Sequence, residues 1–336
     1  MKKYFNSAAK TTLILVYLVI VAGALVRMTG SGMGCPDWPK CFGYYIPPTD
    51  ISEIEWSPNH EFKKGQIIIH EEKLVVAKET FTTSTTFEDV HWEPYTKHDY
   101  ASFNAMHTWI EYINRLCGAL AGMATFAMAI FSFSFWKEKK AIVLLSWLAV
   151  FMMGFQAWLG ATVVYSVLAP VRITVHMVMA LLIVAVILYI LHLANRKPIT
   201  FVKNRLFQNV VVISIILTLI QVVLGTQVRQ LVDEQVKAVG YNPALWLDNP
   251  TVTFYIHRTF SFIVLGINLF LYLQNKKLKL GYQKINWVLL LLIIEVISGV
   301  GMYYFDFPFG LQAIHLVIAS ILFGVQFYLI LETRRK

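Results

Sequence analysis

The sequence is poor in charged residues. Only 15% of its 336 residues are Asp, Glu, Lys or Arg, whereas 57% are hydrophobic. Soluble domains carry about 25% charged and about 45–50% apolar residues, so this composition argues against a soluble enzyme. The chain also lacks the Gly, Pro and Ser bias of a disordered protein. It has no Gly-rich nucleotide fingerprint, which argues against a bound nicotinamide or flavin.

The apolar residues lie in blocks of about 20, the length that crosses a bilayer core roughly 30 Å thick. Backbone polar groups in lipid must be satisfied within the spanning segment, which favours helices. The predicted fold class is therefore an all-α polytopic membrane protein. Its eight transmembrane helices are expected at 11–27, 105–135, 141–164, 172–195, 206–226, 251–274, 285–304 and 311–333.

The net charge of +9 does not indicate a nucleic-acid partner, because most basic residues fall in alternate connections between the apolar blocks. They are Lys2, Lys3, Lys10, Lys137, Lys139, Lys140, Arg196, Lys197, Lys203, Arg205, Lys276, Lys277, Lys279, Lys284, Arg334, Arg335 and Lys336. This is the positive-inside pattern of a multi-pass protein surrounded by membrane lipid. An even number of spans puts both termini in the cytoplasm, as expected in a bacterial cytoplasmic membrane. No small-residue cleavage site follows the first span, so we expect it to be retained.

Two connections on the outer side are long. Residues 28–104 contain strand-like runs at 67–69 and 74–77 and predict a small outer subdomain. Residues 227–250 show apolar residues at helical spacing with charges on the other side. This pattern predicts either an amphipathic helix lying on the membrane surface or a loop helix packed on the subdomain.

Short motifs recur between the two halves of the chain. The first matching pair is Gly23–Arg27 with Gly225–Arg229, and the second is Tyr112–Arg115 with Tyr255–Arg258. A further set of matches at constant spacing joins Gln156, Gly160, His176 and Ala180 to Glu295, Gly299, His315 and Ala319. The matches predict two pseudo-symmetric four-helix bundles, 1–200 and 201–336, arranged as a parallel repeat.

Four histidines lie near the outer ends of the even-numbered spans: His107, His176, His257 and His315. Ionisable groups inside a membrane are costly and are usually functional, although a single histidine is more often satisfied by an interhelical hydrogen bond. His257 and His315 occur at equal depth in repeat-related spans, so we predict that both are ligands. Zinc would favour three or four donors, whereas two imidazoles on facing helices suit a heme iron.

The N-terminal half differs from this pattern. Asn114 stands where the other half has His257, and His107, Glu111 and Asn114 share one helix face. Arg115 lies four residues after Glu111, so the carboxylate has two candidate roles: catalysis, or an ion pair that only locks the helix. A heme with two histidine ligands suits electron transfer. A site with one firm ligand, a carboxylate and an open position suits substrate chemistry.

Two of the three cysteines lie in the outer loop, in the run Cys35–Cys41. The location outside the membrane, the intervening prolines and the short spacing favour a disulfide between them over two free thiols.

Taken together, these motifs resemble the heme A synthase family over nearly the whole chain. The resemblance rests on Gly23–Arg27, Thr29–Gly32, Cys35–Pro39, Glu111–Arg115, His176, His257–Arg258 and His315. It implies oxidation of a heme O ring methyl to a formyl group, which gives heme A for terminal oxidase assembly. It also implies an eight-helix fold in two related halves, with an outer-loop cysteine pair.

The resemblance implies a role for each site residue. His257 and His315 would be the axial ligands of a heme b cofactor. The substrate heme would lie in the N-terminal half with His176 on its iron, Glu111 as the catalytic residue and Arg115 nearby. Heme O synthase would supply the heme O, and an external acceptor such as a quinone would receive the electrons.

One departure from the family affects the substrate site, because the family usually has a histidine at the position of Asn114. An amide cannot replace imidazole as a strong iron ligand. Either the substrate heme keeps only His176, or His107 supplies a second ligand from about 10 Å along the same helix face. We expect the first arrangement.

Two other classes of protein remain as alternatives. A membrane b-type cytochrome that only exchanges electrons with quinone predicts two closed bis-histidine sites, and Asn114 and Glu111 count against it. A repeat-built transporter predicts interrupted spans and a midplane site, and Glu295 near the middle of its span keeps that alternative open.

Overall fold

The computed structural model describes residues 2–195 and 201–334. Within them, eight helices are long and apolar enough to cross a membrane. They are α1 (Lys2–Thr29), α2 (Ala105–Ser132), α3 (Lys140–Tyr165), α4 (Pro170–Ala194), α5 (Arg205–Val239), α6 (Val252–Lys277), α7 (Lys284–Tyr304) and α8 (Leu311–Thr333). The predicted all-α polytopic fold is confirmed. Of the basic residues counted above, Arg196, Lys197, Arg335 and Lys336 lie outside the described residues.

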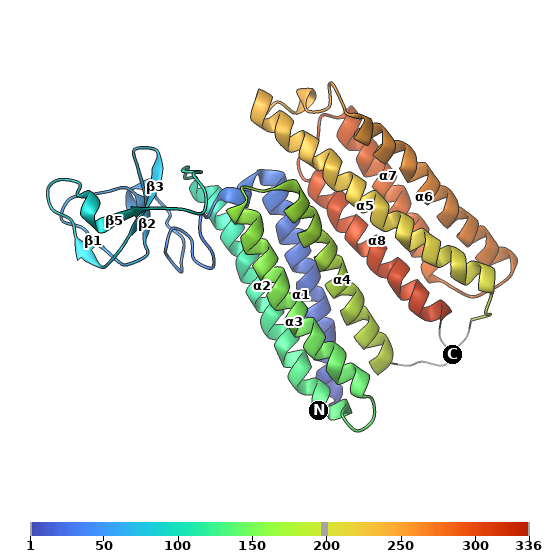
Figure 1. Ribbon diagram of the computed structural model, residues 1–336. Coiled ribbons are helices and arrows are strands. Elements are labelled where there is room, and N and C mark those ends of the chain that lie inside the picture. Colours follow the sequence, from blue (N-terminus) through green and yellow to red (C-terminus); the bar gives the residue numbers. More distant parts are fainter. Residues whose placement is uncertain (1, 196–200, 335–336) are drawn as a thin grey trace.

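The helices form two groups that follow chain order. Figure 1 shows α1–α4 as one bundle beside α5–α8, with both termini at the same end of the molecule. Several local signals fix where helices begin. Asn104 and Asn204 accept hydrogen bonds from backbone N–H groups three residues later, His107 N–H at 3.1 Å and Phe207 N–H at 2.9 Å. Pro170 occupies the first turn of α4, where its missing N–H costs nothing. The division at residue 200 and the pseudo-symmetry of the bundles stay predictions.

The C-terminal bundle combines an apolar core with a buried polar cluster. Phe207, Leu271 and other apolar side chains fill this core. The Ser214 hydroxyl on α5 donates to Asn268 Oδ1 on α6 at 2.9 Å, and Gln326 Nε2 on α8 donates to the Ser214 oxygen at 3.0 Å. Such interhelical hydrogen bonds hold membrane helices together where lipid offers no hydrophobic driving force. The three helices are thereby held in one register.

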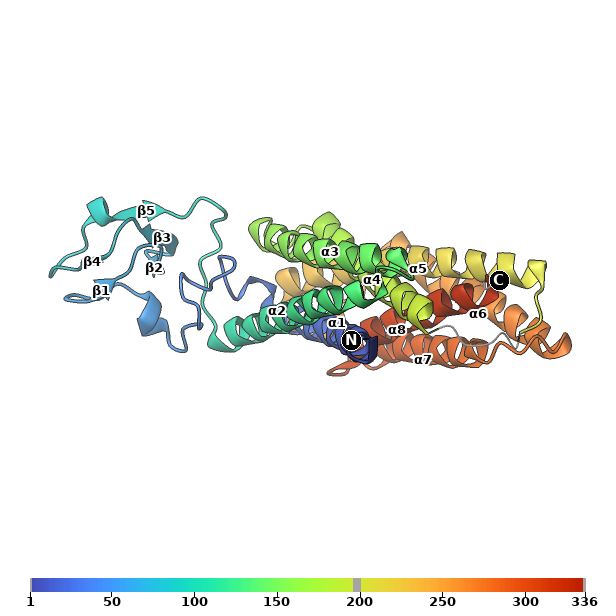
Figure 2. The ribbon, with the colours of Figure 1, turned by 90° about the horizontal axis from the view of Figure 1, so that it is seen from below.

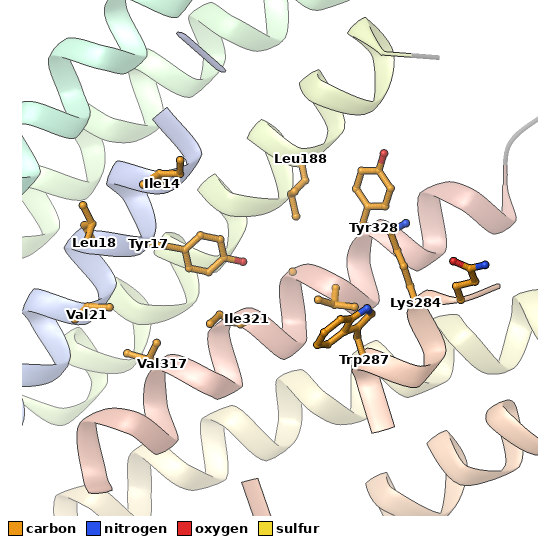
Figure 3. Close-up of a pocket in the computed structure, with 13 residues that line it drawn as sticks. Ile14, Tyr17, Leu18, Val21, Leu188, Lys284, Trp287, Val317, Ile321 and Tyr328 are labelled. Carbon is orange, nitrogen blue, oxygen red and sulfur yellow. The ribbon is translucent and has the colours of Figure 1, made fainter. Parts of the chain in front are cut away.

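The two bundles meet along α1 and α4 on one side and α5 and α8 on the other. A groove of about 700 Å³ lies between them. Figure 3 shows that α1 lines one wall of the groove and α8 another, with Trp287 and Lys284 of α7 towards one end. The lining is mostly apolar.

The second outer connection differs from the prediction. A helix does form there, but it continues α5 without a break to Val239 and does not lie flat as a separate surface helix. Leu231 and Val232 are buried. Asp233 pairs with Arg27 at the end of α1 and, at 2.9 Å, with Arg229. These contacts hold the extension of α5 to the N-terminal bundle.

The first outer connection forms the predicted subdomain. Its strands are β1 (Glu61–Phe62), β2 (Ile67–His70), β3 (Lys73–Ala77), β4 (Phe81–Thr82) and β5 (Trp92–Pro94). β2, β3 and β5 make a three-stranded antiparallel sheet, and β1 pairs with β4. Phe62 and Trp92 stack edge to face in its core, 5.1 Å between ring centroids. Figure 2 shows this segment extending beyond the end of the helices, next to α2.

Candidate functional site

The C-terminal half brings its two candidate ligands together. His257 lies on α6 and His315 on α8, each near the N-terminal end of its helix. Glycines on the neighbouring helices leave room for them. A Cβ at Gly225 would lie 3.2 Å from His257 Cε1, and one at Gly299 would lie 3.7 Å from His315 Cε1. The small residues therefore keep open the space into which the imidazoles project.

The two histidines are held differently. Gln221 donates to the backbone carbonyl of His257 at 2.9 Å, and His257 Nδ1 is buried without a hydrogen-bond partner. The Nδ1 atom of His315 instead lies 2.7 Å from the Ser298 hydroxyl oxygen and 3.0 Å from Glu295 Oε2. Only one of the two rings thus has its Nδ1 atom anchored by neighbouring side chains.

In the N-terminal half, His176 of α4 meets α3. Gln156 Nε2 lies 3.0 Å from the His176 carbonyl oxygen and 3.4 Å from His176 Nε2. Gly160 faces the ring, because a Cβ there would lie 3.4 Å from His176 Cε1. Asn114 of α2 sits against Gly23 of α1, where a Cβ would lie 3.8 Å from Asn114 Oδ1. That amide oxygen is buried and unpaired.

Glu111 is engaged with the outer loop. Its side chain is almost fully buried, with the residue only 4% exposed. Arg115 Nη2 binds Glu111 Oε1 at 2.5 Å, which confirms the ion pair anticipated from their spacing. The backbone N–H of Cys35 donates to Glu111 Oε2 at 2.9 Å, a contact that the sequence did not reveal. Within the described ranges, no hydrogen bond or ion pair joins Glu111 to His176.

Arg115 also binds the backbone of the cysteine loop. Its Nη1 atom donates to the carbonyl oxygens of Asp37 and Lys40, each at 2.7 Å. The disulfide between Cys35 and Cys41 is present, as predicted. The pair Glu111–Arg115 therefore couples the outer end of α2 to the disulfide loop.

The carboxyl group of Asp37 is buried in this loop, which disfavours its charged form. Burial raises the pKa of its carboxyl group, opposed by the Gly43 N–H bond and by the nearby Arg115 guanidinium. Gly43 N–H donates to Asp37 Oδ2 at 2.9 Å, while Asp37 Oδ1 is buried without a partner. The loop is thus closed by a carboxylate that loses solvation on folding.

His107 lies apart from His176. It occupies the first turn of α2, where its backbone N–H bonds to the Asn104 side chain. Gly34 packs on the α2 backbone at this point, because a Cβ there would come within 2.5 Å of the His107 carbonyl oxygen. His107 therefore lies where the outer segment meets α2.

Sequence reasoning missed a charged clasp between the bundles. Asp233 pairs with both Arg27 and Arg229, and Arg229 Nη2 donates to the Arg27 carbonyl oxygen at 2.7 Å. The two arginines occupy repeat-matched positions, which the sequence had shown. The acid between them follows Arg229 by four residues, so the pairing could have been suspected from helical spacing. The groove in Figure 3 is lined by none of the candidate histidines, and neither Glu111 nor Arg115 borders it.

Eight apolar helices with an outer β-rich segment define a multi-pass helical membrane protein. Within that class the chain belongs to the cytochrome oxidase assembly protein family, COX15-CtaA, whose model matches residues 8–327.

Relatives with curated names agree with this assignment over most of the chain. It is 24% identical to a heme A synthase of Wolbachia pipientis wMel, over 96% of this chain and 91% of the relative. It is 24% identical to one of Alkalihalophilus pseudofirmus, over 98% and 97% respectively. A heme A synthase of Ehrlichia canis is 22% identical, over 94% of this chain and 89% of the relative.

Proposed function

We propose that this protein is a heme A synthase of the bacterial cytoplasmic membrane, with both termini in the cytoplasm. It would oxidise the heme O ring methyl to a formyl group, giving heme A for terminal oxidase assembly. The observation that carries the proposal is the placement of His257 and His315 near the N-terminal ends of α6 and α8 in one bundle, each against a glycine, Gly225 and Gly299. The family and the names of its relatives support the same reaction.

The C-terminal site fits a heme b. Its two imidazoles come from α6 and α8, and the glycines opposite them leave room for the histidine rings close to the backbone. Heme b bound here would accept and pass single electrons. The chain itself would hold this heme through His257 and His315. Phe254, three residues before His257 on α6, is buried and apolar.

The N-terminal half would take the substrate. His176 would hold the iron of heme O, since Asn114 is a weak ligand and His107 lies at the junction with the outer segment. Glu111 would act near the reacting methyl, either by transferring a proton or by stabilising developing positive charge. Arg115 and the Cys35 N–H fix the Glu111 carboxylate, so its position depends on the closed disulfide loop.

The overall reaction needs an electron acceptor outside the chain. Conversion of a methyl group to an aldehyde removes four electrons from the carbon. We propose that two membrane quinone molecules receive them, two electrons each, that water supplies the formyl oxygen, and that heme O arrives from heme O synthase through the lipid.

The test is extraction of heme from the purified protein after co-expression with a heme O source. We expect heme A in the extract together with a low-spin heme b. His257→Ala should lose the low-spin signal, with folding checked by circular dichroism. Well-folded wild-type protein that holds heme b and leaves heme O unconverted would instead support an electron-transferring b-type cytochrome. Absence of any Soret band would support a transporter.

A further inference from the structure

We propose that Glu295 and Ser298 are positioning residues for the heme site. They would fix the His315 ring in the tautomer that offers Nε2 to the iron, and the Glu295 carboxylate would lower the reduction potential of the bound heme. This inference rests on the proposed function only in taking His315 as an axial ligand.

The tautomer follows from the hydrogen bonds around Ser298. Its hydroxyl donates to the Glu295 carbonyl oxygen at 2.9 Å, which uses its only proton. The same oxygen lies 2.7 Å from His315 Nδ1, and with its proton directed to the carbonyl it would accept from that nitrogen. His315 consequently carries its proton on Nδ1. Its Nε2 atom then carries the free lone pair that a heme iron requires.

Glu295 strengthens this arrangement. Its Oε2 atom lies 3.0 Å from His315 Nδ1, close enough to accept a share of the same proton. A carboxylate within a membrane span is costly and needs a partner. Oε1 is buried without one, and within residues 2–195 and 201–334 no lysine or arginine forms an ion pair with this side chain. The side chain that Glu295 contacts is thus His315.

The matched position in the N-terminal half lacks these acceptors. Gln156 stands where Glu295 stands, and Leu159 stands where Ser298 stands. His176 Nδ1 is buried without a partner, as is His257 Nδ1. Of the three candidate iron ligands, only His315 has an acceptor pair behind its ring. This pair of acceptors is therefore present behind only one of the two candidate ligands of the C-terminal site.

The expected consequence is electronic as well as geometric. Partners that accept the second ring proton of a metal-bound histidine orient the ring and raise its basicity as a ligand. A more basic ligand stabilises the oxidised iron. A neutral amide is a weaker acceptor than a carboxylate, since charge-assisted hydrogen bonds are about twice as strong as neutral ones.

The test is redox titration of the low-spin heme in the full-length protein. Glu295→Gln should retain the heme and shift the titration to higher potential. The ratio of reduced to oxidised heme at a fixed potential should rise about three- to tenfold. Ser298→Ala should shift it in the same direction by less. Gln156→Leu, at the matched position, is the control and should leave the titration unchanged.

The outcomes separate this inference from the proposed function. A low-spin heme that titrates identically in wild type, Glu295→Gln and Ser298→Ala would overturn the positioning role while leaving the heme site intact. If Glu295→Gln fails to fold, Ser298→Ala and its ligand signature in electron paramagnetic resonance decide the question. An unchanged low-spin heme in His315→Ala would instead refute the ligand assignment itself.

Discussion

The two bundles use their polar residues for different purposes. In the C-terminal half, Glu295 and Ser298 stand behind a histidine ring that faces the proposed heme. In the N-terminal half, the carboxylate nearest the outer end is Glu111, which Arg115 and the Cys35 N–H hold against the disulfide loop. The glutamate of the C-terminal half contacts a candidate ligand, whereas the glutamate of the N-terminal half joins a helix to the outer segment. The difference suits a closed electron-transfer site beside an adaptable substrate site.

The largest effect is expected at Glu111. Glu111→Gln should reduce the conversion of heme O by about 10²–10⁴-fold, the usual contribution of one general acid or base. Its low-spin heme b should remain, because the C-terminal half is unchanged. Heme extraction and a reduced spectrum of the same sample measure both quantities. Glu138→Gln, at an exposed glutamate paired with Lys2, is the control and should convert normally. If folded Glu111→Gln converts heme O at a near-normal rate, the assignment of the reaction to the N-terminal half is wrong.

The next largest effect compares two arginines at matched positions. Arg115→Met leaves Glu111 buried without its partner and should cost about 3–5 kcal/mol of stability. Arg258 is exposed and stacks over the Tyr255 ring, 5.3 Å from its centroid, so Arg258→Met should cost about 0.5–1 kcal/mol. Thermal unfolding of both variants in detergent measures the difference. Equal losses would show that Arg115 does not clamp the loop.

A third variant makes the halves more alike. Asn114→His places an imidazole at the position that matches His257. With heme O present, the substrate heme should become low-spin, because the open iron position is filled. His107→Ala is the companion variant and should leave the spectrum unchanged. A loss of substrate heme in His107→Ala would instead assign His107 as a second ligand. Optical spectra before and after reduction provide the measurement.

The smallest effect concerns Asp37. Its pKa is raised by burial, so the folded protein holds this proton more tightly than the unfolded chain does. Stability should therefore fall as the pH rises from the unfolded pKa near about 4 through the folded pKa. Asp37→Asn removes the charge and can still accept from Gly43 N–H. The melting temperature of Asp37→Asn should increase relative to that of wild type as the pH rises through this window. A gain that is the same at every pH would contradict this account of the Asp37 charge.

The membrane fold could be predicted because its signal is local. Each span is a run of apolar residues long enough to cross lipid, and positive charges mark alternate connections. Strands β2 and β3 were also visible as short β-branched runs. The course of α5 was not predictable. Hydropathy falls after Gly225, but nothing there breaks a helix, and the ion pair that ties the extension to the N-terminal bundle joins Asp233 to Arg27, 206 residues away in the sequence.

The candidate site was predictable where helical spacing or the repeat exposes it. Glu111 and Arg115 follow the spacing of four, and His257 and His315 stand out as ionisable groups in matched spans. The bond from Cys35 N–H to Glu111 was hidden, because it links a backbone group to a helix 76 residues later. Ser298 was not predicted, because the repeat is visible only where the two halves carry similar residues, and the counterpart of Ser298 is Leu159. Its position three residues after Glu295 was the available clue.

The reduced optical spectra of His176→Ala and His315→Ala, recorded on purified folded protein, test the division of labour between the bundles most directly. The account predicts that His315→Ala loses the low-spin heme b, whereas His176→Ala keeps it and fails only to convert heme O. The reverse pattern, with the low-spin heme lost in His176→Ala and retained in His315→Ala, would contradict it.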